Sequence, residues 1–476
     1  MSQFFGRQKE LEQLNRLLKK PTASLAVIKG RRRVGKSRLA EEFSKSHKTF
    51  TFIGLAPEAK VTARMQCKNF TSQMQRYFKI PGLQNVTDWS DILWHLAEET
   101  KKGQIVIILD EINWIGSKDP TFLGKLKSAW DQYFKRNPKL IMILSGSMSA
   151  WIEKNILSST AFVGRISLDL TLQELPLNQC GHFWRKQERL VSSYEKFKLL
   201  SVTGGIPRYL EEIDPTISSD ENIRRLCFEK EGMLFNEFEK IFNDLFAKKG
   251  DVYRKILEHL ATGKADIEEL CEAIQMKRGG TVSKYLHNLK ITGFIAQDAT
   301  WNLKDGTVSK LSYYRLRDNY TRFYLKYIKP NKEKIEQGVI AKPPAWDTIM
   351  GLQFENLVLN NYKLLWHKLT IKTDDIVFAN PFFQRKTDVQ EGCQIDYLIQ
   401  TKYNVLYLFE IKFSRDSITS AIREEVSEKI KRLKTPKHFS IMPVLIHVGG
   451  VADSVRESEF FSHIIDFADF FTEGEA

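Results

Sequence analysis

Cysteine is scarce in this chain of 476 residues, and its few copies are scattered. The five cysteines are Cys67, Cys180, Cys227, Cys271 and Cys393, and none of them forms a C-x-x-C pair. An odd number without close spacing argues against a disulfide framework and against a structural zinc site. The pattern is typical of proteins from a reducing cytosol, so we expect a cytoplasmic protein.

Long hydrophobic runs are also missing. No apolar stretch approaches the roughly 20 residues of a membrane span, and the segment after Met1 lacks the basic-then-apolar plan of a signal peptide. We find neither low-complexity segments nor internal repeats. The sequence therefore predicts no membrane partner and an ordinary folded chain of about two to four domains.

Acidic residues are outnumbered by basic ones. The chain has 72 Lys and Arg against 58 Asp and Glu, which gives a net charge of +14. A basic balance favours polyanionic partners, of which nucleic acid is the most plausible. We therefore expect DNA as a partner.

One glycine-rich segment carries the strongest chemical signal. Residues 30–37 fit the pattern G-x-x-x-x-G-K-[ST], and they follow an apolar run at 25–28 and precede helical spacing. Strand, glycine loop and helix together predict a phosphate-binding loop, in which backbone N–H groups and the helix N-terminus face the phosphates. Lys36 is expected to reach the β- and γ-phosphates, and Ser37 to ligate Mg²⁺. The nucleotide-contacting set is Gly30, Arg31, Arg32, Arg33, Val34, Gly35, Lys36, Ser37 and Arg38.

Two acids end the next continuous apolar run. Residues 105–109 read as a central parallel strand, and Asp110 and Glu111 follow directly. Asp110 is expected to hold Mg²⁺ through water, and Glu111 to polarise the water that attacks the γ-phosphate.

Three further polar residues have two interpretations each. Ser145 and Ser147 follow a third apolar strand, and either could sense the γ-phosphate or simply form a turn. Arg165 follows Gly164 and is either a phosphate-sensing arginine or a solvated surface side chain. An arginine acting between subunits would require a homo-oligomer, whereas one acting within its own chain would not.

The pattern of the chain predicts four domains or subdomains and one connector. Residues 1–172 read as a doubly wound α/β core with strands at 25–29, 49–54, 105–109, 140–145 and 166–170. Residues 173–249 read as a helical lid, and a turn at 203–207 precedes a helix that Pro207 would start well. Residues 250–328 read as a winged helix, 330–344 as a connector and 345–476 as a further α/β domain.

The winged-helix segment has a candidate DNA-reading helix. Three helical patterns, at 253–260, 267–274 and 281–290, precede a hairpin with its turn at Asp305 and Gly306. The basic residues on or just before the third helix are Lys277, Arg278, Lys284, His287 and Lys290. This is where a DNA-reading helix would lie, although the module could equally pack as a lid or contact protein.

A second chemical constellation lies near the C-terminus. Strands at 394–399 and 404–413 bring Asp396 beside Glu410 and Lys412, and strand alternation puts Glu410 and Lys412 on one face. Two carboxylates suit Mg²⁺, and a lysine beside them can orient water for attack on phosphorus. Glu355, on a helix, could add a further carboxylate. The alternative is a salt-bridged sheet edge or an inactive remnant of a nuclease.

Several of these motifs resemble one family. Phe5-Gly6-Arg7-Gln8-Lys9-Glu10-Leu11 looks like the F-G-R-x-x-E-L box that precedes the P-loop in archaeal-type AAA+/STAND-related ATPases. The loop at 30–37, the strand end at Asp110, Gly164-Arg165 and Gly204-Gly205-Ile206-Pro207 resemble further motifs of that family. The resemblance extends through a winged helix into a restriction-endonuclease-like domain, in which Asp396, Glu410 and Lys412 match a D…E-x-K core.

The resemblance implies ATP or GTP binding with Mg²⁺ and nucleotide-driven rearrangement between the core and the winged helix. It also implies that Pro207 and the Phe5–Arg7 box border the nucleotide base. The chain departs from the nuclease pattern, because Cys393-Gln394-Ile395 stands before Asp396 where a Pro-Asp pair is usual.

Three functions fit these observations. In the first, ATP binding and hydrolysis are coupled to DNA binding or to Mg²⁺-dependent DNA cleavage. In the second, the protein is a non-cleaving ATP-dependent switch whose C-terminal domain only binds nucleic acid or protein. In the third, the P-loop drives a motor that acts on protein; the basic charge and the carboxylate–lysine group weigh against it.

Overall fold

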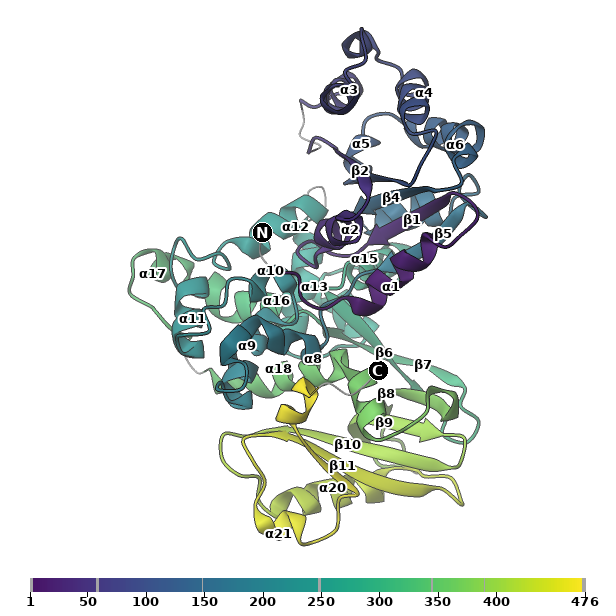
Figure 1. Cartoon of the computed structure of the whole chain (residues 1–476). Helices are drawn as coiled ribbons and strands as arrows, with labels where there is room; N and C mark the ends of the chain where they lie inside the picture. The colour runs from purple at the N-terminus through teal and green to yellow at the C-terminus, as the bar shows by residue number, and fades with distance from the viewer. Residues whose placement is uncertain are drawn as a thin grey trace. The chain divides into compact units, whose positions relative to one another are not determined.

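The computed structural model describes residues 3–56, 60–147, 149–246, 250–343, 346–388 and 390–472. The chain divides into two compact units, Met1–Glu174 and Leu175–Ala476. Figure 1 shows the elements of both, with the first unit in purple and blue. No helix among the described residues combines the length and the apolar character needed to cross a membrane.

The first unit is built around a five-stranded parallel sheet with the order β2-β3-β4-β1-β5. Its strands are β1 Ser24–Lys29, β2 Lys48–Ile53, β3 Ile105–Asp110, β4 Leu140–Gly146 and β5 Ile166–Thr171. All five strands expected from the sequence are confirmed to within one residue at each end. Every residue of β1, β3 and β4 is buried, because helices cover both faces of the sheet.

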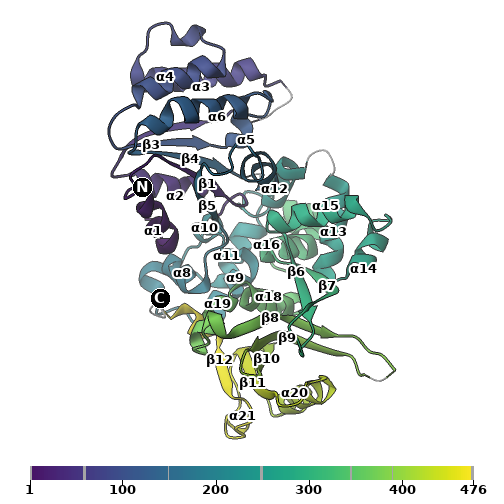
Figure 2. The ribbon, with the colours of Figure 1, turned by 90° about the vertical axis from the view of Figure 1, so that its right-hand side faces the viewer.

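The helices of this unit form a layer on each side of the sheet. They are α1 Gln8–Leu17, α2 Lys36–Ser44, α3 Ala63–Phe78, α4 Trp89–Glu99, α5 Ile112–Ile115, α6 Phe122–Gln132 and α7 Ser149–Ile152. Figure 2 shows α3, α4 and α6 on one face and α1 and α2 on the other. Because parallel strands all end at the same edge, the loops after β1, β3 and β4 meet there, with β4 between the other two.

The second unit begins with a helical part, as expected. Its elements are α8 Leu177–Cys180, α9 Ser193–Thr203, α10 Pro207–Leu210, α11 Ser219–Cys227 and α12 Glu237–Phe246. Three helices and a hairpin follow: α13 Gly250–Thr262, α14 Ile267–Ala273, α15 Gly280–Ile291, β6 Ile295–Trp301 and β7 Val308–Leu316. This is the order expected for residues 250–316.

The connector expected at 330–344 is not wholly irregular. It contains α17 Lys332–Glu336, which follows α16 Asn319–Phe323. Ile335 of α17 is buried, so part of the connector packs against the unit. Pro344, part of the expected connector, lies outside the described residues.

A mixed five-stranded sheet completes the second unit, in the order β12-β11-β10-β9-β8. Its elements are α18 Asp347–Asn360, α19 Tyr362–Lys368, β8 Ile376–Gln384, β9 Cys393–Thr401, β10 Val405–Phe413, α20 Ala421–Arg432, β11 Ser440–Val448, α21 Asp453–Arg456 and β12 His463–Asp466. Ile422 and Val426 of α20 pack on one face of this sheet. The other face meets α18 and α9, where Phe354 and Phe413 both contact Phe197.

The hairpin β6–β7 lies alongside β8. Asn380 Nδ2 donates to the carbonyl of Ala299 at 2.9 Å, and Trp301 Nε1 donates to Gln400 Oε1 at 2.6 Å. Trp301 is itself part of the core of the mixed sheet. The hairpin is therefore attached to this sheet by these contacts, in addition to its contacts with the helices that precede it.

Candidate functional site

The loop after β1 has the conformation of a phosphate cradle. Gly30 and Gly35 have φ angles of 150° and 90°, and Arg33 between them has a φ of 74°. A Cβ on Gly30 would lie 2.5 Å from the carbonyl oxygen of Leu172, so the strand end and the loop leave no room for a side chain. α2 begins directly at Lys36, which points the helix N-terminus at the loop.

The other side chains of the loop pack against the surrounding protein. Val34 is fully buried and Arg31 nearly so, while the Arg32 guanidinium lies 5.4 Å from the centre of the Trp114 ring. Arg38, one turn into α2, faces Glu41 at 3.8 Å. The backbone therefore forms the phosphate cradle, and the arginine side chains of the loop lie around it.

Lys36 lies inside the loop. Its Nζ donates to the carbonyl of Arg31 at 3.0 Å, and the side chain is buried. Burial lowers the pKa of Lys36, whereas the nearby Glu111 and Asp110 act in the opposite direction. A buried ammonium held beside two carboxylates is the arrangement expected of a lysine that binds the β- and γ-phosphates.

Ser37 and Asp110 are brought together from separate elements. Ser37 Oγ donates to Asp110 Oδ2 at 2.7 Å, which joins the first turn of α2 to the end of β3. A hydroxyl and a carboxylate at this separation are the hard oxygen ligands that Mg²⁺ prefers, so these residues fit the expected magnesium site. When bound there, Mg²⁺ would neutralise phosphate charge.

Glu111 is held by residues from two other segments. Its Oε2 accepts hydrogen bonds from Ser147 Oγ at 2.9 Å and from Ser147 N at 3.2 Å. The Asn113 amide, oriented so that both of its polar atoms are satisfied, donates to the same oxygen at 3.1 Å. Ser147 therefore lies at the sheet edge beside Glu111, whereas Ser145 Oγ is buried and has no partner among the described residues.

Arg7 braces the loop. Its Nη2 donates to the carbonyls of Val34 at 3.1 Å and Gln173 at 2.5 Å, and its Nη1 pairs with Glu10. The side chain is buried, and the backbone of Arg7 is left-handed. Through Arg7, the Phe5–Arg7 box therefore holds the phosphate loop in position. Contact of this box with the nucleotide base stays a prediction.

Arg165 is far from this site in the same unit. It precedes β5, and Leu25 at the start of β1 pairs with Ile166, so Arg165 lies at the edge of the sheet opposite to the phosphate loop. Its guanidinium pairs with Asp131 of α6 at 2.8 and 2.9 Å, and this pairing lowers the pKa of Asp131 to about 2. Arg165 consequently does not join the nucleotide site of its own chain in this arrangement.

Replacing Arg165 by Ala is therefore expected to leave ATP hydrolysis by a monomeric chain within about twofold of wild type. Losing this surface pair should change the midpoint of thermal denaturation little, because exposed ion pairs are screened by solvent. Steady-state hydrolysis at low protein concentration tests the first statement, and thermal denaturation the second. A large loss that appears only at concentrations where subunits associate would show an action between subunits.

Pro207 begins α10 in the second unit. The preceding turn is tight, because Leu175 N donates to the carbonyl of Gly205 at 2.7 Å and a Cβ on Gly205 would lie 2.1 Å from Leu175 O. α10 is only one turn long. A role of Pro207 at the nucleotide base stays a prediction.

The C-terminal constellation gathers around Asp396. The pairing of β9 with β10 ends at Tyr397 and Phe409, and beyond it Asp396 Oδ2 accepts the backbone N–H of Ile411 at 2.9 Å. Where the two strands separate, the Asp396 carboxylate thus accepts a backbone hydrogen bond that a carbonyl of the neighbouring strand would otherwise accept. Burial raises the pKa of both Glu355 and Glu410, and the charge of Asp396 raises both further.

Glu410 and Lys412 share one face of β10, as strand alternation predicts, and both meet α20. Lys429 of α20 pairs with Glu410, which is buried, and Lys412 pairs with Glu425 at 2.8 Å at an exposed position. Within the described ranges, no three His, Cys, Asp or Glu side chains lie close enough to hold a metal ion. Magnesium binding by Asp396, Glu410 and Glu355 stays a prediction.

Three basic residues that the sequence interpretation missed lie beside Glu355. Lys264, in the loop after α13, Arg315 of β7 and Arg322 of α16 line the same pocket as this acid. Burial raises the pKa of Glu355 to about 7, Asp396 adds to the shift, and the three cations oppose it. No periodicity or motif marks these cations, because each belongs to a different element.

Comparison with known proteins agrees with the first site. Residues 4–213 match the model of a family described as an ATPase domain predominantly from Archaea, so the match continues past Glu174 through the turn before Pro207. An uncharacterized protein of Methanocaldococcus jannaschii is 26% identical over 345 residues, which are 71% of each chain.

The solved structures that are similar to this chain include the two that follow. The Walker-type ATPase PabY2304 of Pyrococcus abyssi has a TM-score of 0.50 at 19% identity, over 68% of this chain and 96% of that one. The ORC2 protein of Aeropyrum pernix has a TM-score of 0.43 at 16% identity, over 69% of this chain and 93% of that one. The first likeness shows a shared fold. Together with the geometry of Lys36, Ser37 and Asp110, the match over residues 4–213 shows that the protein is an ATPase.

Proposed function

We propose that this ATPase hydrolyses ATP with Mg²⁺ and couples its nucleotide state to DNA binding by its second unit. The observation that carries the hydrolytic part is the convergence at one sheet edge of Lys36, the Ser37–Asp110 contact and Glu111. These groups supply a phosphate-binding ammonium, magnesium ligands and a base for water.

The DNA-binding part rests on charge and on the exposed helix α15. The chain carries a net charge of +14, and Lys284 and His287 of α15 are exposed together with Lys277 and Arg278 just before the helix. We propose that α13–α15 and the hairpin act as a winged helix with α15 as its DNA-reading helix. Exposed cations on one helix suit phosphate contacts, which depend steeply on salt.

Fluorescence anisotropy of a labelled DNA duplex tests this proposal. Binding should weaken with salt and should differ between ATP and ADP, and Lys284→Glu should lower affinity more than Lys230→Glu, which changes an exposed lysine of the same unit. Equal affinity with ATP, with ADP and without nucleotide would remove the coupling, and equal effects of the two variants would remove the role of α15.

DNA cleavage is a second candidate, favoured by the electrostatic influence of Asp396 on the buried Glu355 and Glu410. It predicts Mg²⁺-dependent cutting of plasmid or single-stranded DNA that falls by at least about 10²-fold in Asp396→Ala and in Lys412→Ala. Gel assays with and without ATP measure it, and Lys363→Ala on α19 serves as the exposed-lysine control. Cutting retained in both variants would contradict the assigned site.

ATP hydrolysis without cutting in the wild type would instead support the non-cleaving switch. The ion pairs of Glu410 with Lys429 and of Lys412 with Glu425 favour this outcome, because they occupy the groups that cleavage would need.

A further inference from the structure

A small pocket of about 220 Å³ lies inside the second unit, next to the carboxylates. Separate elements bring its charged side chains together: Lys264 from the loop after α13, Asp298 from β6, Arg315 from β7, Arg322 from α16 and Glu355 from α18. Three cations thus line the pocket against two acids. Converging charges from five segments of one compact unit make a formed site rather than a chance surface patch.

Arg322 is the least expected of these cations. It is 2% exposed, and it donates to Gln353 Oε1 at 2.7 Å and to the carbonyl of Leu316 at 3.0 Å, neither of which is an acid. Its Nε has no partner among the described residues. A buried guanidinium without a direct ion pair is costly, because the charges of Glu355 and Asp318 offset its desolvation only in part and further negative charge would stabilise it. An anion in the pocket would supply that charge.

Lys264 is a second cation without an ion pair in the described part of the chain. Its Nζ lies over the Phe383 ring, 4.4 Å from the ring centre. Arg315 differs from both, because its Nε pairs with Asp298 at 2.9 Å. After that pairing, Glu355 is the remaining acid opposite Lys264 and Arg322 among the side chains that line the pocket, and the charge of Asp396 also acts on Lys264.

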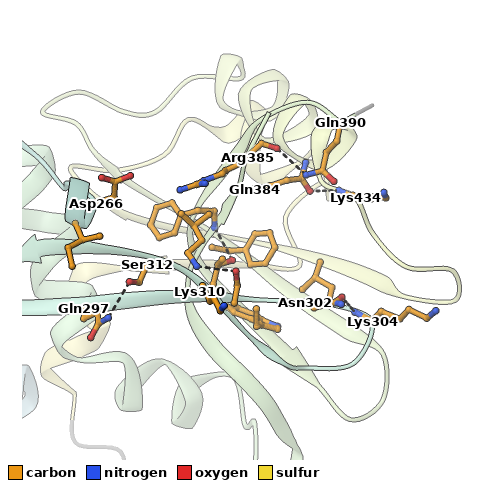
Figure 3. Close-up of a pocket in the computed structure, with 18 of the residues that line it drawn as sticks. Asp266, Gln297, Asn302, Lys304, Lys310, Ser312, Gln384, Arg385, Gln390 and Lys434 are labelled. Carbon is orange, nitrogen blue, oxygen red and sulfur yellow. Dashed lines mark hydrogen bonds between the residues drawn. The ribbon is translucent and has the colours of Figure 1, made fainter. Parts of the chain in front are cut away.

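A basic groove of about 1000 Å³ shares Phe383 with the pocket. It runs between the β6–β7 hairpin and the end of β8, and Figure 3 shows Lys310, Arg385 and Lys434 around it. Two further basic residues, Arg278 and Lys304, line it against the acids Asp266 and Glu268, and Arg278 pairs with Glu268. The groove therefore extends the positive field of the pocket along the surface.

We infer that this pocket binds a phosphate group and that the groove holds the rest of the molecule bearing it. Guanidinium and ammonium groups are the side chains that bind phosphate best, through charge-assisted hydrogen bonds. The phosphate belongs either to a nucleic-acid strand or to a free phosphate compound. The pocket goes beyond the proposed function; only its assignment to a DNA strand rests on that function.

Equilibrium dialysis of radiolabelled inorganic phosphate and anisotropy of a labelled DNA oligonucleotide test the inference. Both use the full chain carrying Lys36→Ala, so that the phosphate loop does not contribute. Lys264→Met should lower affinity by about tenfold, the effect of one lost charge-assisted contact. Lys196→Met is the matched control, because Lys196 lies 4.9 Å over the ring of Phe471 and away from the pocket.

Arg322→Lys is the second variant, and it keeps the charge while losing the planar fork. It should weaken binding several-fold, with circular dichroism unchanged. Losses in both assays support a nucleic-acid phosphate, and a loss for inorganic phosphate alone supports a free phosphate compound. Unchanged affinity in both variants, or no phosphate or DNA binding by the parent chain, overturns the pocket. DNA binding that persists at wild-type strength in both variants leaves the proposed DNA binding intact.

Discussion

Lys36→Ala is expected to reduce ATP hydrolysis by on the order of 10³-fold, because it removes the cation that lies inside the phosphate loop. Asp110 and Glu111 both act electrostatically on the Lys36 ammonium, and its loss removes the positive charge that offsets these two carboxylates at the site. Nucleotide binding should weaken as well. Release of inorganic phosphate and binding of a fluorescent ATP analogue measure the two effects.

Lys45→Ala is the control for this variant. Lys45 follows α2 and pairs with Glu42 at an exposed position, so it removes a positive charge from the same helix without touching the loop. Its hydrolysis should stay near that of the wild type. Normal hydrolysis by Lys36→Ala would show that the loop is not the site of ATP chemistry.

Glu111→Gln is expected to slow hydrolysis by about 10²- to 10⁴-fold while ATP still binds. The amide keeps the shape of the carboxylate and can still accept hydrogen bonds from Ser147, but it cannot take a proton from water. Single-turnover hydrolysis should therefore fall while the affinity for the fluorescent ATP analogue changes little.

Asp119→Asn is a suitable comparison, because Asp119 is a partly buried acid that caps the turn before α6 through Thr121. It should hydrolyse ATP normally. If Glu111→Gln retained hydrolysis within a few-fold of the wild type, another group would have to activate the water, and the assignment of Glu111 would be wrong.

The ATPase site could be predicted from the sequence because its signals are local. A glycine loop between an apolar strand and a helix, and two acids after the next buried strand, fix both partners of the Ser37–Asp110 contact. The position of Arg165 relative to the phosphate loop could also be predicted from the sequence. It precedes its strand whereas the loop follows β1, and in a parallel sheet these two positions lie at opposite edges.

The other features of the candidate sites could not be predicted, because they depend on contacts between segments that are distant in the sequence. Strand alternation places Glu410 and Lys412 on one face, but it does not reveal that α20 brings Lys429 and Glu425 to them. Nothing in the local sequence marks Lys264 or Arg322 as neighbours of Glu355, because tertiary packing alone brings them there. Asn113 went unnoticed for a similar reason, since its role appears only once Glu111 turns toward Ser147.

The hairpin that lies alongside β8 has a consequence for the solubility of the C-terminal sheet. β8 is the outermost strand on its side of that sheet, and an uncovered outer strand offers its backbone groups to other chains. The hairpin shields it through the hydrogen bond of Asn380 to Ala299 and through the ring contacts of Trp301 with Phe378 and Phe382 of β8. A fragment that starts after Leu316 would lose this shield, so it should self-associate through β8, whereas a fragment that keeps β6 and β7 should stay monodisperse.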